Sequence, residues 1–311
     1  MAARTGLGAA ACPSQPVDAA AEPELQPSSK LPRISRSLLT VQDSARTVGK
    51  GGCGSVLEGE YDGRPVAVKI CKESPYIELL RYEGEALYSL QHPCLLRPIA
   101  LVDEPGFCAL VMPLYKHGSV MDALYERNRN PASKLTQAQR VRMALKAAQG
   151  LACMHRHNWV HLDIKSQNLL CDLTNPDDPA VAVADLGLAQ HTAGPFSIGL
   201  GCGTGPWMGP EHYRPNVQLT NKVDIYAFGV VLWELAQHCG SLPSSNYTKS
   251  QWKHGVHTVR GRRPSCQGIL QYWPNDYVAL MRACWRTKPE DRPCAECVVR
   301  QLAAILEKME R

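Results

Sequence analysis

The stretch HLDIKSQN, residues 161–168, constrains this chain most, because it holds an acid, a cation and an amide at short spacing. Asp163 can accept the proton of an attacking hydroxyl group, and Lys165 can stabilise a phosphoryl group in transfer. Asn168 can bind Mg²⁺ through its amide oxygen. The strand-like VAVADLG that follows supplies Asp185 as a second metal ligand. The pattern predicts a catalytic loop followed by a metal-binding acid.

A glycine-rich stretch, VGKGGCGSV at residues 48–56, precedes this loop and has the spacing G-x-G-x-x-G-x-V. Small residues let backbone N–H groups approach phosphate oxygens closely. Strands are predicted over 53–61 and 64–70, joined by a tight turn at Asp62-Gly63. This favours a hairpin that covers a nucleotide over the strand-to-helix turn of a dinucleotide or Walker site.

Val-Ala-Val-Lys ends the second of these strands at Lys69, which we expect to face a cleft and bind phosphates. The alternative is an exposed lysine on an edge strand. A lysine in the cleft needs a carboxylate to hold it, and a helix predicted over 77–90 offers Glu83 and Glu85. We favour Glu83, because it lies nine residues before His92 in an E-x8-HP arrangement, whereas Glu85 points about 200° round the helix.

Two further strands, over 97–102 and 107–112, complete a small lobe of sheet and one helix. Beyond Gly118 the pattern becomes helical. Helices are predicted over 135–158, with Thr136 as N-cap, and over 223–238, 278–285 and 295–309. A β-lobe joined to a helical lobe predicts an α+β fold with a ligand cleft between the lobes.

The composition excludes several classes of protein. The net charge of +5 comes without a Lys/Arg block, so we expect no binding of nucleic acid. No run of eighteen apolar residues occurs, so we expect no membrane span. Residues 1–34 are rich in Ala, Pro, Ser and Gln and are predicted to be disordered.

The 13 cysteines occur without a signal peptide, which indicates thiols kept reduced and a cytoplasmic protein. Cys294 and Cys297 have CxxC spacing, but no second such pair accompanies them. A structural zinc site usually needs four ligands, so we do not expect zinc here.

The order and spacing of these motifs closely resemble the eukaryotic protein kinases, over roughly residues 42–308. The resemblance implies an α+β, two-lobed protein kinase fold, with a small β-sheet lobe carrying one helix and a larger helical lobe. It implies a kinase domain at 35–311, with an N-lobe at about 42–115 and a C-lobe at about 116–308.

By the same resemblance, Asp224 anchors the catalytic loop and Arg292 pairs with Glu211. ATP and Mg²⁺ are the implied cofactors, and a protein is the implied substrate. Catalytic roles fall to Lys69, Glu83, Asp163 and Lys165, and metal binding falls to Asn168 and Asp185. Contacts to ATP are expected from Val48, Gly49, Lys50, Gly51, Gly52, Cys53, Gly54, Ser55, Val56, Ala67, Lys69, Met112, Leu114 and Leu170.

The sequence departs from the common kinase pattern at four positions. Leu162 replaces an arginine that faces a phosphate on the activation segment in many kinases, so we expect a weaker phosphorylation switch. Leu186 replaces Phe in DFG, and Gly209 replaces Ala in APE. Pro113 follows the predicted gatekeeper Met112 and removes one backbone N–H from the adenine site.

Substrate class is inferred from the catalytic loop. Lys165 is typical of serine/threonine kinases, and the hydroxyl of Thr204 can reach Asp163 and Lys165; dual specificity stays open. Thr192 and Ser197 are candidate regulatory hydroxyls, with plain exposed loop residues as the alternative reading.

The HLDIK loop and GKGGCGSV are similar to the Mos group, which implies a MAP kinase kinase kinase of oocyte meiosis acting on MAP kinase kinase. The alternatives are a tyrosine-kinase-like kinase of another subgroup and an inactive kinase-fold scaffold.

Overall fold

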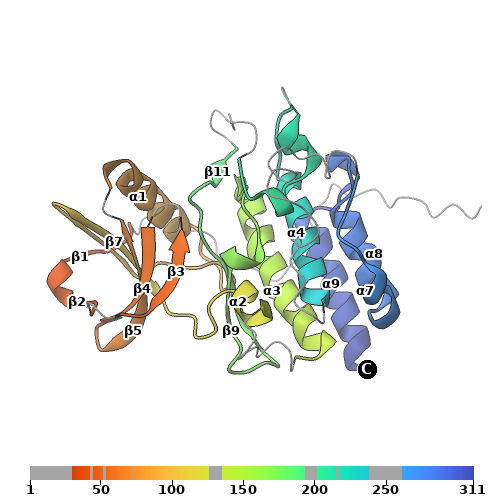
Figure 1. Ribbon diagram of the computed structural model, residues 1–311, viewed down its shortest axis with the longest axis horizontal. Coiled ribbons are helices and arrows are strands. Elements are labelled where there is room, and N and C mark those ends of the chain that lie inside the picture. The colour runs from red at the N-terminus through yellow and green to blue at the C-terminus, as the bar shows by residue number, and fades with distance from the viewer. Residues whose placement is uncertain are drawn as a thin grey trace, which may run out of the picture.

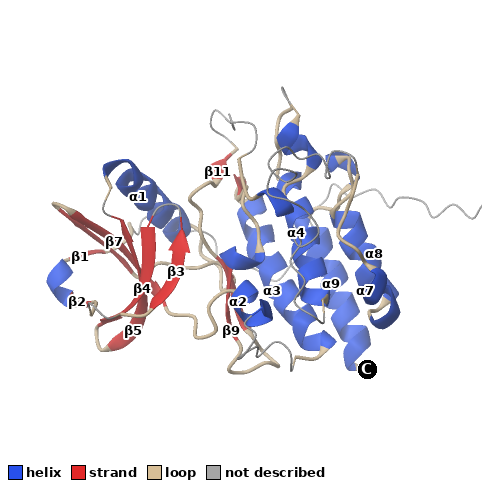
Figure 2. Cartoon of the chain, in the orientation of Figure 1, coloured by secondary structure: helices blue, strands red, loops and turns tan. Residues whose placement is uncertain are grey.

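The computed structural model describes residues 30–42, 45–51, 54–71, 73–125, 135–192, 202–214, 217–237 and 261–311. Gly52, Cys53 and Ser197, named above, lie outside the described residues. Most strands gather in one lobe and most helices in the other (Figures 1 and 2). This arrangement confirms the predicted α+β, two-lobed architecture.

The small lobe is built on a sheet of seven strands in the order β1-β6-β7-β5-β4-β2, with β3 also pairing with β4. The β4–β5 turn lies at Asp62 and Gly63, as predicted, with φ of 52° and 69°. Positive φ at both central residues is what a type I′ hairpin turn requires. The strands are β1 (Arg33–Ile34), β2 (Leu39–Thr40), β3 (Thr47–Gly51), β4 (Gly54–Tyr61), β5 (Arg64–Cys71), β6 (Ala100–Glu104) and β7 (Phe107–Pro113).

The prediction that disorder extends to residue 34 is wrong for residues 30–34. Leu31 is 2% exposed, and β1 pairs in parallel with β6. The Pro32 carbonyl also accepts the N–H of Leu101 at 2.8 Å. The composition averaged over residues 1–34 gave no sign of one buried leucine and a short strand. Because these belong to the small lobe, that lobe begins before residue 42.

A second correction concerns β6, which was predicted to begin at residue 97 and begins at Ala100. Pro98 has no N–H to donate to a neighbouring strand, which explains the later start. Helix α1 (Ser74–Ser89) packs against this sheet through Leu80 and Leu87, both fully buried. The helix also carries Glu83 and so brings it toward β5.

The large lobe is centred on α3 (Gln137–Arg156) and α4 (Lys222–Ala236), seen side by side in Figure 1. Thr136 caps α3 as predicted, in a reciprocal capping box with Gln139. Every residue of α4 after Lys222 is buried, so this helix forms the centre of the lobe. The other helices are α2 (Val120–Tyr125), α7 (Gln267–Tyr272), α8 (Asn275–Cys284) and α9 (Ala295–Glu310).

Short elements between α3 and α4 position the catalytic loop. Strands β9 and β10 form an antiparallel pair, and β11 pairs with β8. Their bounds are β8 (Trp159–Val160), β9 (Leu169–Asp172), β10 (Ala180–Val183) and β11 (Gln190–His191). Single turns of 3₁₀ helix are η1 (Arg36–Leu38), η3 (Ser166–Asn168), η4 (Gly205–Trp207), η5 (Pro210–Tyr213) and η6 (Pro289–Asp291).

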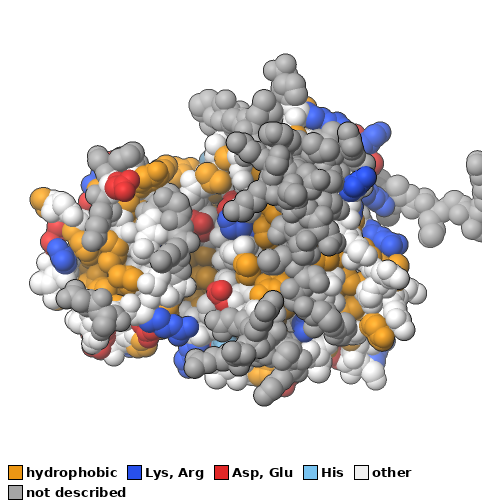
Figure 3. Space-filling model, viewed as in Figure 1, with side chains coloured by type: hydrophobic (Ala, Val, Ile, Leu, Met, Phe, Trp, Pro, Cys, Tyr) orange, Lys and Arg blue, Asp and Glu red, His pale blue; other side chains and the backbone are white. Residues whose placement is uncertain are grey.

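On the face drawn in Figure 3, Lys and Arg side chains lie on both lobes, with Asp and Glu among them. The positive net charge is therefore spread over the described part of this face. In the described residues, no helix is long and apolar enough to span a bilayer.

Candidate active site

Lys69 is held between two carboxylates from distant parts of the chain. Its Nζ lies 2.9 and 2.7 Å from the two carboxylate oxygens of Glu83, and 3.1 Å from Oδ1 of Asp185. Glu83 is buried, whereas Glu85 is exposed and accepts the N–H of Leu31 at 3.4 Å. The predicted pairing of Lys69 with Glu83 is thus present, and the alternative pairing with Glu85 is not.

The charges of this cluster stabilise one another. Burial alone would lower the pKa of Lys69, but the Glu83 carboxylate and then Asp185 raise it. Burial would raise the pKa of Asp185, but the Lys69 ammonium holds that pKa below its ordinary value. Both groups are therefore charged at neutral pH.

Asp185 is the partly exposed member of this cluster. Its side chain keeps 44% of its surface exposed, against 9% for Lys69. Its φ of 66° is uncommon for a residue other than glycine, and such conformations gather at functional sites. Leu186 is fully buried in the main core, together with Leu87 of α1, as expected of the residue that replaces Phe.

The catalytic loop brings Asp163 together with a cation, a hydroxyl and an amide. Thr204 donates to Oδ1 of Asp163 at 2.6 Å and accepts from Nζ of Lys165 at 2.9 Å. Lys165 also forms an ion pair with Oδ2 of Asp163. The Asn168 amide N–H₂ donates to the Asp163 carbonyl at 2.8 Å and to Oδ2 at 3.2 Å. The predicted reach of Thr204 to both charged groups is confirmed.

A buried carboxylate below the loop fixes its backbone. The two oxygens of Asp224 each accept one backbone N–H at 2.8 Å, from His161 and Leu162. The ring Nε2 of His155 also lies 2.8 Å from Oδ2. Full burial would raise the pKa of Asp224, but these hydrogen bonds, that of His155 first, hold it low. The predicted anchoring of the loop by Asp224 is therefore present.

Leu162 lies in a small apolar cluster. It is 4% exposed and packs with Val160, Leu219 and Val223. Its φ of 69° is rare for a leucine, and the two flanking hydrogen bonds to Asp224 maintain it. Van der Waals packing thus fixes this position, where an arginine would supply a positive charge.

Six of the apolar residues expected to contact ATP lie in the main core or pack against it. Ala67 of β5 lies opposite Met112 of β7, and both are buried in the main core. Four partly buried residues pack against the same core: Val48, Val56, Leu114 and Leu170.

A cleft of about 570 Å³ is lined by two of these residues. Val48 and Leu114 line it, and the polar residues Arg46, Glu58 and Asp122 line it too. These three polar residues were not predicted from the sequence.

A second buried acid, Glu234 of α4, was also missed. Oε1 accepts from Ser166 at 2.7 Å and from Tyr125 at 3.4 Å, and Oε2 accepts from Trp207 Nε1 at 2.8 Å. Burial raises the pKa of Glu234 to about 7. Ser166 belongs to the catalytic loop, so this acid supports the loop from below. A lone acid within the apolar stretch VVLWELA was the available signal.

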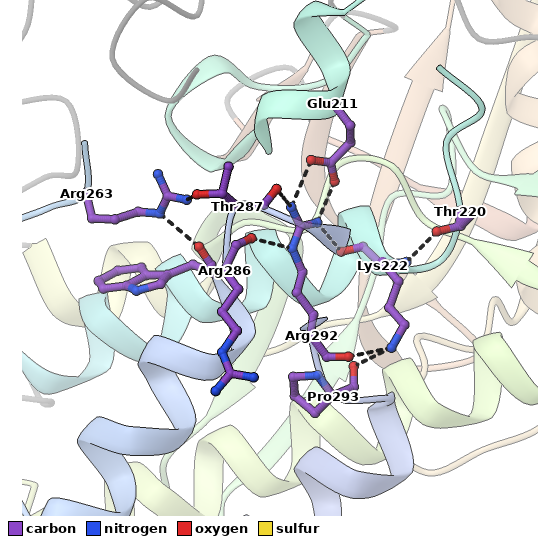
Figure 4. Close-up of polar contacts among 9 residues, drawn as sticks. Glu211, Thr220, Lys222, Arg263, Arg286, Thr287, Arg292 and Pro293 are labelled. Carbon is purple, nitrogen blue, oxygen red and sulfur yellow. Dashed lines mark hydrogen bonds and ion pairs between the residues drawn. The ribbon is translucent and has the colours of Figure 1, made fainter. Parts of the chain in front are cut away.

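Glu211 and Arg292 form the predicted pair at the end of the activation segment (Figure 4). Nη2 of Arg292 lies 2.8 Å from Oε2 of Glu211, and both side chains are buried. Arg292 also donates to the carbonyl oxygens of Arg286 and Lys222, at 2.8 Å each. The pair thus joins the activation segment to α4 and to the segment before α9.

The side-chain oxygens of Asp185 and Asn168 fit the binding of Mg²⁺ together with ATP. In the described residues, no three His, Cys, Asp or Glu side chains form a metal site. Mg²⁺ commonly takes only one or two protein ligands and completes its shell with phosphates and water. Asp185 has a second oxygen not used by Lys69, and the Asn168 amide nitrogen is engaged by Asp163, which leaves its oxygen for a metal.

A sequence model of the protein tyrosine and serine/threonine kinase family matches residues 43–302. The chain belongs to this family. It is 32% identical over 251 residues to a probable serine/threonine-protein kinase of Dictyostelium discoideum, covering 79% of this chain and 26% of that relative. It is 31% identical to mouse leucine-rich repeat serine/threonine-protein kinase 1, over 82% of this chain and 14% of the relative.

A third relative is human mitogen-activated protein kinase kinase kinase 13, at 29% identity over 79% of this chain and 23% of that protein. The chain therefore spans about a quarter or less of the length of these relatives. What they share with it is the kinase domain.

Proposed function

We propose that this protein kinase transfers the γ-phosphate of ATP to serine and threonine hydroxyls of proteins. The observation that carries the proposal is the joint arrangement of two clusters, Lys69 with Glu83 and Asp185, and Asp163 with Lys165 and Thr204. Each group that the chemistry needs is present, and one loop carries Asp163, Lys165 and Asn168 in mutual contact. This argues against the scaffold alternative.

The chain's own residues have distinct tasks in this reaction. Asp163 orients the attacking hydroxyl and accepts its proton, and Lys165 stabilises negative charge on the group in transfer. Lys69, fixed by Glu83, holds phosphates. Asn168 and Asp185 would hold Mg²⁺, which when bound would neutralise charge on the phosphates of ATP, the source of the phosphoryl group. Most of the rate then comes from positioning.

Serine/threonine specificity is supported by Lys165, which lies two positions after Asp163. Its ammonium donates to the hydroxyl of Thr204 in the activation segment. The names of the relatives point the same way. A more specific proposal is a MAP kinase kinase kinase that phosphorylates MAP kinase kinase, which is supported by the likeness to human mitogen-activated protein kinase kinase kinase 13. A role in oocyte meiosis rests on the Mos-like motifs alone, and a cytoplasmic location rests on the reduced thiols that the sequence predicts.

A transfer assay tests this proposal. Wild type, Asp163→Asn and the control Asp276→Asn receive Mg·ATP with a catalytically dead MAP kinase kinase or with a generic basic protein. We expect transfer by wild type and by the exposed control variant, and a loss of at least about 100-fold in Asp163→Asn. A preference for MAP kinase kinase would support the more specific proposal. ATP binding by wild type without transfer would favour the scaffold instead.

Regulation should depend little on phosphate in the activation segment, because Leu162 is packed into an apolar cluster. Thr192, one candidate hydroxyl, is exposed and donates to the Asn158 carbonyl at 3.1 Å. Phosphatase treatment of the purified kinase should change its transfer rate by less than about twofold. A loss of tenfold or more would mean that another cation takes the place of the missing arginine.

A further inference from the structure

Two cysteine sulfurs lie next to each other at the start of α9. Cys294 is the N-cap of this helix, and its Sγ accepts the backbone N–H of Cys297 at 3.3 Å. The Cys294 thiol donates to Sγ of Cys297 across 2.8 Å. Both residues are partly exposed. The first helical turn therefore holds two accessible thiols in contact.

The surroundings of Cys297 favour its thiolate. Nη2 of Arg300 lies 3.2 Å from Sγ of Cys297, one turn further along the exposed face of α9. A guanidinium, a thiol donor and the N-terminal end of a helix all stabilise negative charge on this sulfur.

Other cysteines of the chain are in a different environment. Burial raises the pKa of Cys94 and Cys108 to about 11, and that of Cys171 and Cys284 to about 12. Those thiols are protonated at neutral pH and enclosed by the core. The CxxC pair combines exposure, mutual contact and a neighbouring cation.

A metal does not explain the pair. Within the described ranges, no cluster of three or more His, Cys, Asp or Glu side chains could hold a metal ion. Structural zinc sites use four such ligands. The two sulfurs therefore suit chemistry that needs two thiols and no third ligand.

We propose that Cys294 and Cys297 form a reversible dithiol–disulfide site that reacts with small-molecule disulfides of the glutathione type. The Cys297 thiolate attacks one sulfur of the small disulfide, which breaks its S–S bond and releases one thiolate. Cys294 then loses its proton and attacks the Cys297 sulfur, which releases the second small thiolate. The two protons of the protein thiols end on the two released thiols, and the protein gains one S–S bond.

The position of the site gives the bond a structural context (Figure 4). Pro293 directly precedes Cys294, and its carbonyl oxygen accepts from Nζ of Lys222 at 3.1 Å. Arg292, one residue earlier, holds Glu211. A disulfide would add a covalent link next to this junction.

The test follows thiol chemistry and does not need kinase activity. The full chain is incubated with glutathione disulfide, quenched with N-ethylmaleimide and analysed by intact mass and peptide mapping. Wild type should lose the mass of two hydrogens, with Cys294 and Cys297 protected from alkylation and no glutathione retained on them. Dithiothreitol should restore both thiols.

Single variants separate the two steps. Cys294→Ser should retain one glutathione on Cys297, because no second thiol can release it. Cys297→Ser should react roughly tenfold more slowly, because the sulfur beside Arg300 is gone. Cys266, which is partly exposed with its Sγ 3.7 Å from the Pro264 carbonyl, is the internal reference.

Two results would overturn the proposal. One is full alkylation of both cysteines in wild type after treatment with glutathione disulfide. The other is a Cys294→Ser variant whose Cys297 takes up glutathione no faster than Cys266 does.

Discussion

Two buried ion pairs, one in each lobe, differ in what surrounds them. Lys69 and Glu83 are 9% and 3% exposed in their side chains, and Arg292 and Glu211 are 0% and 4% exposed. The Lys69 ammonium is shared with Asp185, whose side chain is 44% exposed. The remaining donors of Arg292 go instead to backbone carbonyl oxygens.

The difference separates a working pair from a structural one. Lys69 shares its ammonium with a partly exposed carboxylate, so we expect its contacts to be redistributed when phosphates bind. Arg292 is enclosed by fixed acceptors, so any change breaks several contacts at once. Burial alone therefore does not tell whether an ion pair acts in catalysis or in stability. The further partners of the cation, Asp185 for Lys69 and carbonyl oxygens for Arg292, distinguish the two cases.

The largest effect on stability is expected from Arg292→Leu. Glu211 would be left as a buried carboxylate without its partner, and removal of one member of such a pair costs about 3–5 kcal/mol. Urea denaturation should show this loss. Arg286→Leu, which removes an exposed guanidinium from the same loop, should cost less than about 0.5 kcal/mol.

Arg292→Lys keeps the positive charge but loses the planar guanidinium. Its stability should therefore lie between that of wild type and that of Arg292→Leu. The contrast between the two ion pairs fails if Arg292→Leu is as stable as wild type.

Lys69→Met should show the opposite balance of effects. Phosphoryl transfer should fall by about 100- to 1000-fold, because a charge that meets the phosphates is removed. Stability should fall by only about 1–2 kcal/mol, because Glu83 can take up a proton beside the cleft. Transfer rates and urea denaturation check both parts, with Lys288→Met as the exposed control. A loss of stability equal to that of Arg292→Leu would remove the distinction.

Much of the active site could be predicted because its residues lie close together in sequence or repeat at the helical period. The spacing of Asp163, Lys165 and Asn168 already brings them into one loop. The choice of Glu83 over Glu85 followed from the spacing of Glu83 to His92 and from the separation of the two acids around one helix. The turn at Asp62-Gly63 followed from two residues that tolerate positive φ.

Contacts that depend on tertiary structure could not be predicted. Leu31 lies in a segment of polar composition, yet it is buried by residues that are far away in sequence. The packing of Leu162 against Leu219 and Val223 joins positions about sixty residues apart, which no local period encodes. Pairing with β1 gives β6 a partner that the sequence of β6 does not reveal.

Glu234 offers a third case beside the two ion pairs. It is a buried acid whose hydrogen bonds come from the neutral groups of Ser166, Tyr125 and Trp207. Its pKa is raised by burial from 4.5 to about 7. Between these pH values the unfolded chain has lost this proton and the folded chain retains it. Folding therefore takes up a proton, and stability falls as pH rises through this window.

Glu234→Gln cannot ionise, so its stability should depend less on pH. The difference in unfolding free energy between variant and wild type should change by on the order of 1–3 kcal/mol between about pH 4.5 and pH 7. Urea titrations at both pH values measure it, with the exposed Glu290→Gln as control. Parallel pH curves for Glu234→Gln and wild type would contradict the assignment.

The smallest effect is expected at Gly209, where many kinases carry alanine. A Cβ here would lie 2.7 Å from Oε2 and 2.8 Å from Oε1 of Glu211. With φ of −72° the backbone itself accepts alanine, so only this collision opposes the change. Because Arg292 fixes the carboxylate, Gly209→Ala should cost about 1 kcal/mol.

A double-mutant cycle tests whether the cost at Gly209 comes from the rigidity of the ion pair. In the Arg292→Lys background the carboxylate has more freedom, so Gly209→Ala should cost less there than in wild type. The coupling should be about 0.5 kcal/mol or more, measured by urea denaturation. Equal costs in both backgrounds would show that Glu211 moves aside freely. The acceptors around Arg292 would then not hold Glu211 rigidly, and the contrast drawn with the pair at Lys69 would lose its basis.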